Sequence, residues 1–416
     1  MSHSIPDAAA IAVRTPVGTV FHSGDYKFDH TPVHSSPTDF GRLAELGRDG
    51  VLLFMGDSTR IESAGYTPSE RVISATFDRV FADAPGRIII STFASLISRI
   101  QQVIDTAKLW DRKVAFVGRS MVNNVTMSLD LGYLHADPGL IINVDDIKKL
   151  PDEHVVVMTT GAQGEPTSGL TRMANGDHRQ INIKPGDTVV ISASPIPGNA
   201  TLIARTINNL FRLGANVLYH GIADVHVSGH AAQEEQKLLM RLLNPRFFMP
   251  IHGEYRHLAL HARLAQTMGI PPENIVIAED GDIVKTDGET ITKDGHVSAG
   301  YVFVDGLGVG DVGEVVLRDR RVLSQDGVAI VVVTIDKQTG RIIAGPDLIS
   351  RGFVYVRESG DLIEDARQHV LSAMASGGGE MSEWNFVQTR LKEVLSRFLY
   401  ERTRRRPMIL PVVMEV

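Results

Sequence analysis

Four histidines lie in the segment VHVSGHAAQEEQKLLMRLLNPRFFMPIHGEYRHL, residues 225–258, and imidazole side chains can bind metal ions or contact phosphate. His252 follows an apolar run and precedes a glycine, so its imidazole could bind zinc or manganese, although backbone hydrogen bonds could equally satisfy it. Asp25 also ends an apolar run beside a glycine, where it could bridge two metal ions or serve only as a turn residue. His226 and His257 are more consistent with orienting neighbouring groups or capping helices.

Three loops share a pattern in which a strand, a run of small residues and a helix follow one another. They are STFASLIS (91–98), SASPIPGN (192–199) and HVSGHA (226–231). In the last of them, Ser228 and Gly229 should leave backbone N–H groups free at the start of a helix, beside His230, where an anion binds well. One such loop is usually only a helix cap, but three in one chain favour a ligand that carries phosphate.

Apolar strands alternate with amphipathic helices through most of the chain, and these elements must position the polar loops. The runs VLLFM and RIIIS are typical of buried strands, and residues 200–213 show a helical pattern. In such an α/β arrangement, ligands bind at the loops that follow the strand ends. Past about residue 295, longer β-branched strands are expected around Asp326-Gly327, then a helix within residues 383–406 and a final strand within residues 406–416. These elements predict a separate domain for assembly or for guiding substrate.

The composition limits the kinds of site and ligand. A chain of 416 residues that is 43% hydrophobic and 22% charged is typical of a globular protein with two or three domains. It contains no cysteine, which excludes thiolate sites and leaves histidine and carboxylate as ligands for a transition metal. This fits the cytoplasm, and no apolar run reaches the roughly 18 residues of a membrane span. With a net charge of −7, binding of nucleic acid would need a local basic groove.

The order of several motifs resembles that of the metallo-β-lactamase/β-CASP nucleases, and most closely ribonuclease J. The motifs are HSIPDA (3–8), GTVFHSGDYKFD (18–29), GDST (56–59), TGAQGEP (160–166), HVSGHA and PIHGEY (250–255), followed by GPDLISRGFVY (345–355) and RTRRRPMILPVVMEV (402–416). The resemblance implies an α/β fold with a metallo-β-lactamase αββα sandwich that is N-terminally incomplete. Its two parts would be residues 1–67 and 221–300, on either side of an inserted β-CASP domain at 68–220, with a C-terminal α/β domain at 301–416.

The resemblance also implies a role for individual residues. His3, Asp25 and His252 match metal ligands for two zinc ions, with manganese or magnesium as alternatives, and Asp305 matches a structural calcium position. Asp57 matches the first acidic β-CASP motif, and His230 the histidine that contacts the scissile phosphate. The nucleotide and 5′-phosphate contacts are expected at Ala94, Ser95, Leu96, His226, Val227, Ser228, Gly229 and His230. Leu96 stands where many relatives have asparagine.

The implied function is metal-dependent cleavage of RNA, both internally and from the 5′ end, in RNA maturation and mRNA decay. The implied partner is RNA, preferably 5′-monophosphorylated. The resemblance implies a homodimer or homotetramer that forms through the C-terminal domain, and an RNA-degradation complex. It implies no membrane partner. Enzymatic alternatives are a β-CASP nuclease for DNA or for RNA 3′ ends, and a lactamase-type hydrolase of small molecules. The non-enzymatic alternative is an RNA-binding or oligomerisation remnant of such a nuclease.

One family signature, HxHxDH, does not occur in the 416 residues, and the chain begins just before the third metal-binding motif. Only His3, Asp25 and His252 would then serve two metal sites, so we expect weak binding of one ion at most. We also expect apolar surface around Ile11, Val13, Val20 and Phe21 to be exposed. The 416 residues alone are therefore expected not to cleave RNA unless a segment that carries HxHxDH is added.

Overall fold

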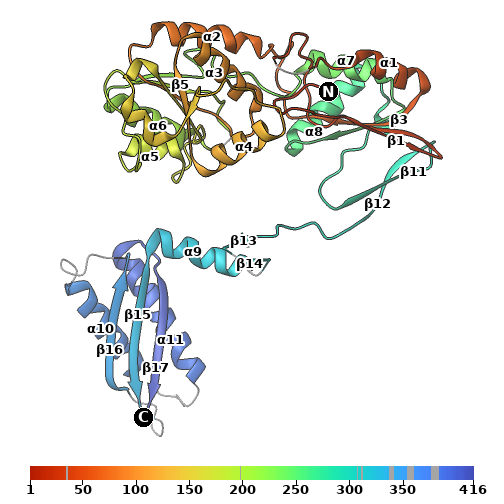
Figure 1. Ribbon diagram of the computed structural model, residues 1–416. Coiled ribbons are helices and arrows are strands. Elements are labelled where there is room, and N and C mark those ends of the chain that lie inside the picture. Colours follow the sequence, from red (N-terminus) through yellow and green to blue (C-terminus); the bar gives the residue numbers. More distant parts are fainter. Residues whose placement is uncertain are drawn as a thin grey trace. The chain divides into compact units, whose positions relative to one another are not determined.

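Figure 1 shows the computed structural model of the chain, which divides into two units, Met1–Ala299 and Gly300–Val416. The structure describes residues 1–33, 36–196, 198–306, 308–310, 313–336, 342–353, 360–375 and 384–416. Both units combine helices with strands, as predicted for an α/β protein. No helix among the described residues is long and apolar enough to cross a membrane.

The first unit contains a four-stranded sheet. In order across this sheet, its strands are β1 (Ile11–Thr15), β2 (Gly18–His22), β3 (Val51–Asp57) and β10 (Phe247–Ile251). β1 and β2 form an antiparallel hairpin, whereas β2, β3 and β10 run parallel to one another. Parallel neighbours end at the same edge of a sheet, so the loops after β2, β3 and β10 meet there.

Helices cover one face of this sheet. A hairpin comes after its last strand, β10, in the chain. These elements are α1 (Phe40–Asp49), α7 (Gln233–Leu243), α8 (Tyr255–Thr267), η3 (Pro272–Asn274), β11 (Asp282–Thr286) and β12 (Ile291–His296). Leu43 of α1 and Leu239 of α7 join Phe54 of β3 in one buried cluster. On the opposite face, Leu53 and Phe247 are buried together with other apolar side chains. The two faces explain why β3 and β10 are continuous apolar runs.

Apolar residues of β1 and β2 were expected to be exposed, and this is correct for β1 only. Ile11 and Val13 in the edge strand β1 are 60% and 51% exposed, as expected. Phe21 in β2 is only 2% exposed, and Val20 is partly buried, so the expectation was wrong for β2. The reason is the position of β2 inside the sheet, where the Phe21 ring packs 6.0 Å from that of Phe54.

The second sheet of the first unit has six strands, all parallel, in the order β6-β5-β7-β4-β8-β9. Their bounds are β4 (Ile88–Ser91), β5 (Lys113–Val117), β6 (Ile141–Ile142), β7 (Val155–Thr159), β8 (Thr188–Ile191) and β9 (Asn216–Tyr219). These strands lie within residues 68–220, the segment predicted to form an inserted domain, although its exact boundaries stay a prediction. The four residues of β4 are all buried, as helices on both faces of a parallel sheet require.

Two sets of helices cover the two faces of the second sheet (Figure 1). On one face lie α2 (Arg71–Asp83), α3 (Ile97–Leu109) and α4 (Arg119–Asp130). On the other lie α5 (Gly169–Asn175), α6 (Ala200–Arg212) and the short η1 (Val144–Lys149), with η2 (Asp152–His154) before β7. The helix predicted from the pattern of residues 200–213 is therefore confirmed as α6.

A buried carboxylate ties the segments around the first sheet together. Glu235 of α7 is fully buried and accepts hydrogen bonds from the backbone N–H groups of Phe28, Thr67 and Ala232 at 2.7, 2.7 and 2.8 Å. Three donors on one carboxylate offset the cost of burying its charge. The segment before α7, which carries His230, is thus anchored to the loops after β2 and β3.

The second unit contains a three-stranded sheet with helices on one face. Its strands lie in the order β16 (Ile342–Arg351), β15 (Val328–Ile335) and β17 (Met408–Glu415). α10 (Gly360–Ala375) and α11 (Trp384–Thr403) pack against it, and a small hairpin, β13 (Val304–Asp305) and β14 (Gly308–Val309), precedes them. α11 confirms the helix predicted within residues 383–406, and its Val387, Leu391 and Leu395 are fully buried. The predicted final strand is confirmed as β17.

The strand expected before Asp326 is a helix instead. Residues Glu314–Asp326 form α9, and only the segment after Gly327 is the strand β15. Val315 and Val316 suggested a strand, but the following LRDRRVLSQD is rich in straight-chain residues that favour a helix. Gly327 ends α9 with a φ of 74°, a left-handed conformation that glycine adopts without strain.

Candidate metal centre and substrate cavity

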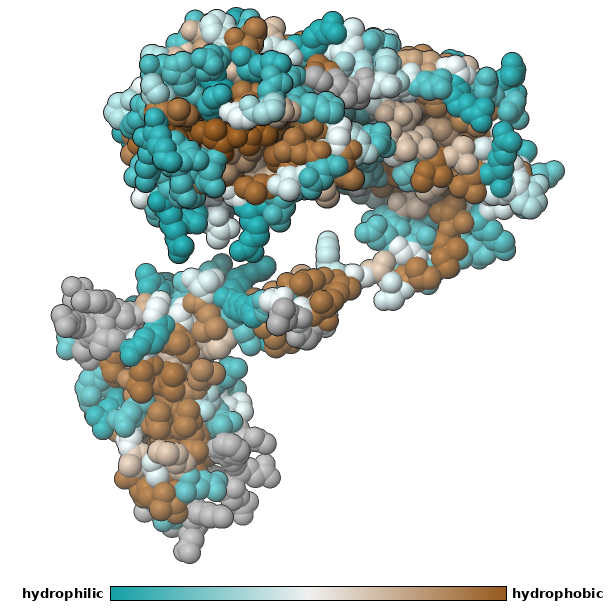
Figure 2. All heavy atoms as spheres, viewed as in Figure 1, coloured by the Kyte–Doolittle hydropathy of each residue, from teal (hydrophilic) through white to brown (hydrophobic). Residues whose placement is uncertain are grey.

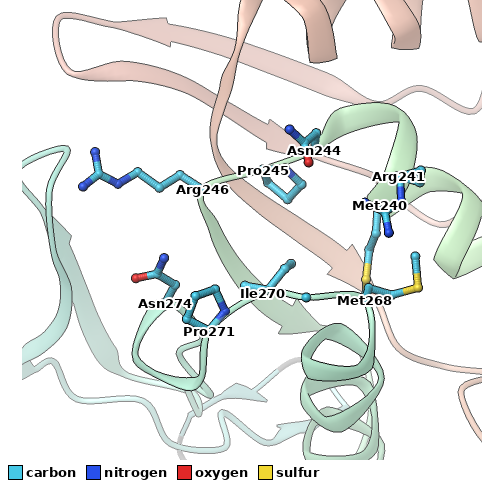
Figure 3. A pocket seen from close by; sticks show the side chains of 10 residues that line it. Met240, Arg241, Asn244, Pro245, Arg246, Met268, Ile270, Pro271 and Asn274 are labelled. Carbon is cyan, nitrogen blue, oxygen red and sulfur yellow. The ribbon is translucent and has the colours of Figure 1, made fainter.

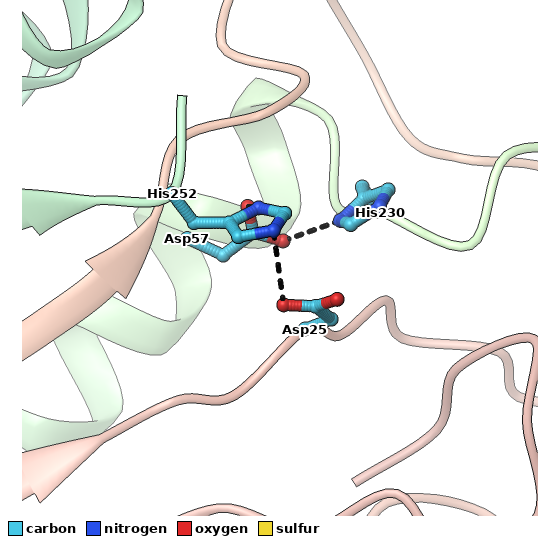
Figure 4. Close-up of side chains that lie close together, drawn as sticks. All are labelled: Asp25, Asp57, His230 and His252. Atoms are coloured by element: carbon cyan, nitrogen blue, oxygen red, sulfur yellow. Dashed lines mark hydrogen bonds and ion pairs between the residues drawn. The ribbon is translucent and has the colours of Figure 1, made fainter. Parts of the chain in front are cut away.

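Two aspartates and two histidines meet at the edge where β2, β3 and β10 end (Figure 4). Asp25 follows β2, Asp57 ends β3, His252 follows β10, and His230 comes from the loop before α7. Each offers one ligand atom, and these four atoms lie within 4.8 Å of one another. The parallel alignment of the three strands therefore places acidic and imidazole groups together, as a transition-metal site without thiolates requires. We refer to these four residues as the cluster.

Asp25 and His252 have the geometry of two ligands of one ion. His252 Nε2 lies 3.7 Å from Asp25 Oδ1, and the structure holds the His252 backbone at a φ of 54°, a conformation that is uncommon outside glycine. Two ligands that each lie about 2.1 Å from a tetrahedral zinc ion are roughly 3.4 Å apart. The observed pair therefore fits a metal such as zinc, and the sequence assignment of both residues as ligands remains consistent with the structure.

His3 lies beside the cluster, although it is not one of the four. Its Nε2 is 3.9 Å from Asp25 Oδ2, and its Nδ1 lies 2.8 Å from the carbonyl oxygen of Gly229. A hydrogen bond from Nδ1 to a carbonyl leaves Nε2 as the metal-binding nitrogen, which is the usual arrangement of ligand histidines. Burial lowers the pKa of His3, which favours the neutral form that a metal ion needs.

Asp57 and His230 form a hydrogen-bonded pair within the cluster. His230 Nδ1 lies 2.7 Å from Asp57 Oδ2, while Thr59 Oγ1 donates to Asp57 Oδ1 at 2.6 Å. Burial would raise the pKa of Asp57, which is 1% exposed, but hydrogen bonds from His230, His252 and Thr59 hold it well below its usual value. Asp57 therefore stays ionised at neutral pH. The hydrogen bond between His252 and Asp57 raises the pKa of His252.

Thr59 is a site residue that the sequence analysis missed. Its hydroxyl lies 2.7 Å from His252 Nδ1 as well as bonding to Asp57, so it orients both side chains. The signal was present in the motif GDST, where Thr59 stands two residues after the acidic one. Ser58 has a similar role deeper in the molecule, with its Oγ 2.9 Å from Nδ1 of the buried His261.

Most of the expected substrate contacts line one cavity of about 700 Å³ beside the cluster. Those that line it are Ser95, Leu96, His226, Val227, Ser228, Gly229 and His230, together with His3. Ala94, the remaining one, lines a neighbouring cavity instead. The Nδ1 of His226 is buried and has no hydrogen-bond partner among the described residues, and burial lowers the pKa of this side chain to about 4. His226 is therefore neutral at pH 7. We call this space the substrate cavity.

The predicted helix start at Ser228 and Gly229 was wrong. α7 begins at Gln233, and Glu235 caps it by accepting from the N–H of Ala232. No helix end therefore opens at Ser228, whose hydroxyl instead accepts from the N–H of His230 at 3.1 Å. The helix starts later than predicted because the Glu235 carboxylate caps the N–H of Ala232.

Other predicted positions lie away from the cluster or have another role. Asp305, in the second unit, accepts a hydrogen bond from Arg320 at 2.6 Å, and no further metal-binding group surrounds it among the described residues. Its calcium role stays a prediction. Nδ1 of His257 accepts from the backbone N–H of Glu254, which is the capping role expected of it. The cavity of Figure 3, at the ends of α7 and α8, contains none of the predicted site residues.

The chain is similar to known proteins of one family. The model for the ribonuclease J beta-CASP domain matches residues 85–210, that for the Zn-dependent metallo-hydrolase RNA specificity domain matches 214–277, and that for the ribonuclease J C-terminal domain matches 315–416. Ribonuclease J2 of Bacillus subtilis is 44% identical over 415 residues, which cover 100% of this chain and 75% of the relative. Ribonuclease J 1 of Streptococcus pyogenes is 43% identical, with 99% and 74% covered, and ribonuclease J of Thermus thermophilus is 44% identical, with 100% and 71% covered.

Proposed function

The chain belongs to the ribonuclease J family, and on this premise we propose which of its residues cut RNA and from which end. A metal-dependent nuclease function in RNA processing follows from the family. The finer proposal is cleavage of RNA at the cluster, both internally and stepwise from the 5′ end. The observation that carries it is the placement of the substrate cavity directly beside the cluster, with His3 and His230 in its lining.

We propose that Asp25 and His252, with His3 beside them, hold the metal. The mixed nitrogen and oxygen donors suit zinc, with manganese or magnesium as alternatives. A bound ion of this kind polarises a phosphate oxygen and makes water a stronger nucleophile at neutral pH. The family model that matches residues 214–277 carries the words Zn-dependent in its description, which supports zinc.

His230 is proposed to contact the scissile phosphate and to pass a proton to the leaving oxygen. Asp57 occupies the Nδ1 side of its ring, so Nε2, which has no partner among the described residues, is left for the substrate. Asp57 stays ionised and holds the His230 ring in place, so that Nε2 can exchange a proton with the substrate. This division of roles resembles that of other aspartate–histidine pairs, in which the carboxylate orients and the imidazole reacts.

The substrate cavity is proposed to hold a 5′-monophosphate. Ser95, Ser228 and Gly229 line it. Leu96, which is apolar and only 3% exposed, forms another part of its wall. Hydroxyl groups and a small residue suit a phosphate, and a space of fixed size favours one phosphate over three. The 5′ end of an RNA would then be held while the next phosphodiester lies at the cluster.

The experiment that tests the function measures cleavage of an end-labelled RNA by the purified protein, with zinc or manganese and then with a chelator. Metal-dependent cleavage that Asp25→Asn abolishes would support it. RNA binding without cleavage, even after an N-terminal segment that carries HxHxDH is added, would favour the non-enzymatic alternative, a remnant that binds RNA. The expectation that the 416 residues alone do not cleave stays a prediction. Repeating the assay with an added N-terminal segment that carries HxHxDH tests it.

The open face of the sheet in the second unit supports a homodimer. Ile330 in β15 lies between Ile349 of β16 and Leu410 of β17, and the last two are 47% and 45% exposed. Val412 and Met414 continue the same face, and Figure 2 shows hydrophobic surface over these strands. Contiguous exposed apolar surface marks interaction sites. We propose that this face packs against a second copy, and that dimers can pair into a homotetramer. A cytoplasmic location and an RNA-degradation complex stay predictions.

A further inference from the structure

Two motifs of the second unit, GPDLISRGFVY and RTRRRPMILPVVMEV, contribute no described residue to the substrate cavity or to the cluster. The first has Arg351 at the end of β16, and the second has four arginines within residues 402–406, just before β17. β15 pairs antiparallel with β16 and parallel with β17, so the end of β16 lies at the same edge as the starts of β15 and β17. We call this edge, with Arg351, Arg404, Arg405 and Arg406, the arginine edge.

Gly327, which precedes β15, brings the two motifs into contact. A side-chain carbon on Gly327 would lie 2.5 Å from the carbonyl oxygen of Arg351, so only a glycine lets the two backbones approach this closely. On the other side, the N–H of Met408 donates to the carbonyl oxygen of Gly327 at 2.9 Å. Arg351 itself is exposed, and its Nη1 donates to the carbonyl oxygen of Ser350 at 3.0 Å. Backbone contacts therefore fix the edge from which the arginines extend.

Arg404 and Arg406 have guanidinium groups that stack on Tyr400, near the end of α11. Cζ of Arg406 lies 4.5 Å from the centre of the Tyr400 ring, and Cζ of Arg404 lies 5.6 Å from it. Both arginines are exposed, and neither side chain has a hydrogen bond or an ion pair with any residue that the structure describes. Stacking on a ring leaves the N–H groups of a guanidinium free while it restrains the side chain. Both groups are therefore held in position and available to an anion.

Carboxylates in this region already have other partners. Asp365 accepts a hydrogen bond from Arg402 at 2.6 Å. Asp326 accepts from the backbone N–H of Arg406 at 3.1 Å, a bond that does not use the guanidinium of that residue. The charges of Arg404 and Arg406 are thus paired with no carboxylate within the described part of the chain.

We propose that the arginine edge binds the phosphate backbone of RNA, with Arg404 and Arg406 on phosphate groups. The planar guanidinium matches the oxygens of a phosphate, which accept two of its hydrogen bonds at once. The choice of RNA rests on the proposed function. It also agrees with the net charge of −7, which requires a local basic surface wherever the chain binds nucleic acid. Contacts to phosphate carry no sequence information, so the arginine edge would bind RNA of any sequence.

The test measures the affinity of the full chain for a fluorescent single-stranded RNA by anisotropy, without metal and at several salt concentrations. In the double variant Arg404→Gln/Arg406→Gln, affinity at low salt should fall about tenfold. The slope of log affinity against log salt should also decrease by about 0.7 for each phosphate contact that is lost. Arg390→Gln/Lys392→Gln removes the same charge from exposed positions of α11, about two turns from Tyr400, and should leave the slope unchanged.

The same measurements can contradict the proposal. An unchanged slope in Arg404→Gln/Arg406→Gln, or an equal loss of affinity in the control variant, would overturn it. Light scattering tests whether the edge instead binds an acidic surface of a second copy. Loss of association with unchanged RNA affinity would show that it does, and would also overturn the proposal. Polyuridine and polyadenosine should lose affinity equally, since the contacts read no base. An unchanged melting temperature confirms that each variant is folded.

The proposed function is tested separately, by metal-dependent cleavage with an N-terminal segment that carries HxHxDH added. Weaker RNA binding by Arg404→Gln/Arg406→Gln in a protein that cleaves no RNA would support the arginine edge and contradict the proposed function. Cleavage with unchanged RNA binding by this variant would do the reverse. If both proposals hold, the variant should have a higher KM for long RNA and an unchanged kcat, because the arginine edge contains no residue of the cluster.

Discussion

His230 Nδ1 lies 2.7 Å from Asp57 Oδ2, although the two residues stand 173 positions apart in the chain. Asp57 is almost fully buried, whereas the side chain of His230 is 20% exposed and lines the substrate cavity. The carboxylate thus holds one side of the imidazole, and the residue lines the cavity beside the cluster. His252 also contacts Asp57, with its Nδ1 3.3 Å from Asp57 Oδ1, but its Nε2 lies 3.7 Å from Asp25 Oδ1.

Replacing His230 should therefore reduce catalysis without removing metal. We expect His230→Ala to lower the turnover of the active protein by about 10²-fold or more, the scale for losing one proton-transfer group in the transition state. Bound metal, measured by elemental analysis, should stay the same. His154→Ala, which changes a histidine on η2 far from the cluster in the chain, serves as the control. Loss of metal in His230→Ala would show that His230 is a ligand.

Replacing a proposed metal ligand should instead weaken the binding of metal. Asp25→Asn keeps the size of the side chain but removes its charge, and His252→Ala removes the imidazole altogether. Changes to groups that only support ligands already cost about 10- to 100-fold in metal affinity, so each of these variants should lose at least that much. Metal titration followed by elemental analysis measures the loss. Asp49→Asn, an exposed change at the end of α1, should bind metal normally. Unchanged affinity in Asp25→Asn would rule that residue out.

The substrate cavity predicts a preference for the chemistry of the 5′ end. RNA with a 5′-monophosphate should be degraded from that end faster than the same RNA with a 5′-triphosphate, because the larger group would clash in a space of fixed size. Ser228→Ala should reduce the preference, since it removes a hydroxyl from the lining. Release of mononucleotides from matched RNAs measures both rates. Equal rates on the two ends would exclude the proposed monophosphate site.

His261 predicts how stability changes with pH. It is fully buried, and burial lowers its pKa to about 3, below the ordinary value of 6.5 that applies when the chain is unfolded. Between these values the unfolded chain binds a proton that the folded chain does not, so the free energy of unfolding falls as the pH falls from 6.5. One such group contributes a slope of about 1.4 kcal/mol per pH unit. Urea unfolding at several pH values gives the free energy of unfolding at each pH. Its change per pH unit should be smaller for His261→Gln than for the original chain. Identical slopes would contradict this origin.

The open face of the C-terminal sheet predicts a change in assembly. Leu410→Asp places a charge in the middle of the exposed apolar face and should shift a dimer to monomers, because burying an unpaired charge in an interface is costly. Light scattering after size-exclusion chromatography measures the mass. Arg397→Asp, on an exposed position of α11, is the matched control and should leave the assembly intact. A dimer that persists in Leu410→Asp would place the interface elsewhere.

Local patterns in the sequence were enough to place most elements and to order the motifs. The apolar runs around Phe54 and Phe248 are strands because both faces of each are buried, and such runs can be recognised without knowing what covers them. The same holds for the apolar face of α11. α9 was mistaken for a strand because its valines favour strands, whereas the neighbouring straight-chain residues favour a helix and outweigh them.

Which groups touch one another was decided by the tertiary structure. The residues Asp57 and His252 meet because β3 and β10 align in parallel, with Asp57 beside Ile251, and no local pattern specifies that register. The N-terminus of α7 is occupied by Glu235, which also binds the backbone at Phe28, so a helix end that the sequence suggested for phosphate is already satisfied. A residue's type limits the chemistry that it can perform. Its partners depend on long-range packing, since a hydrogen bond between distant segments forms only where the buried faces of the strands and helices bring those segments together.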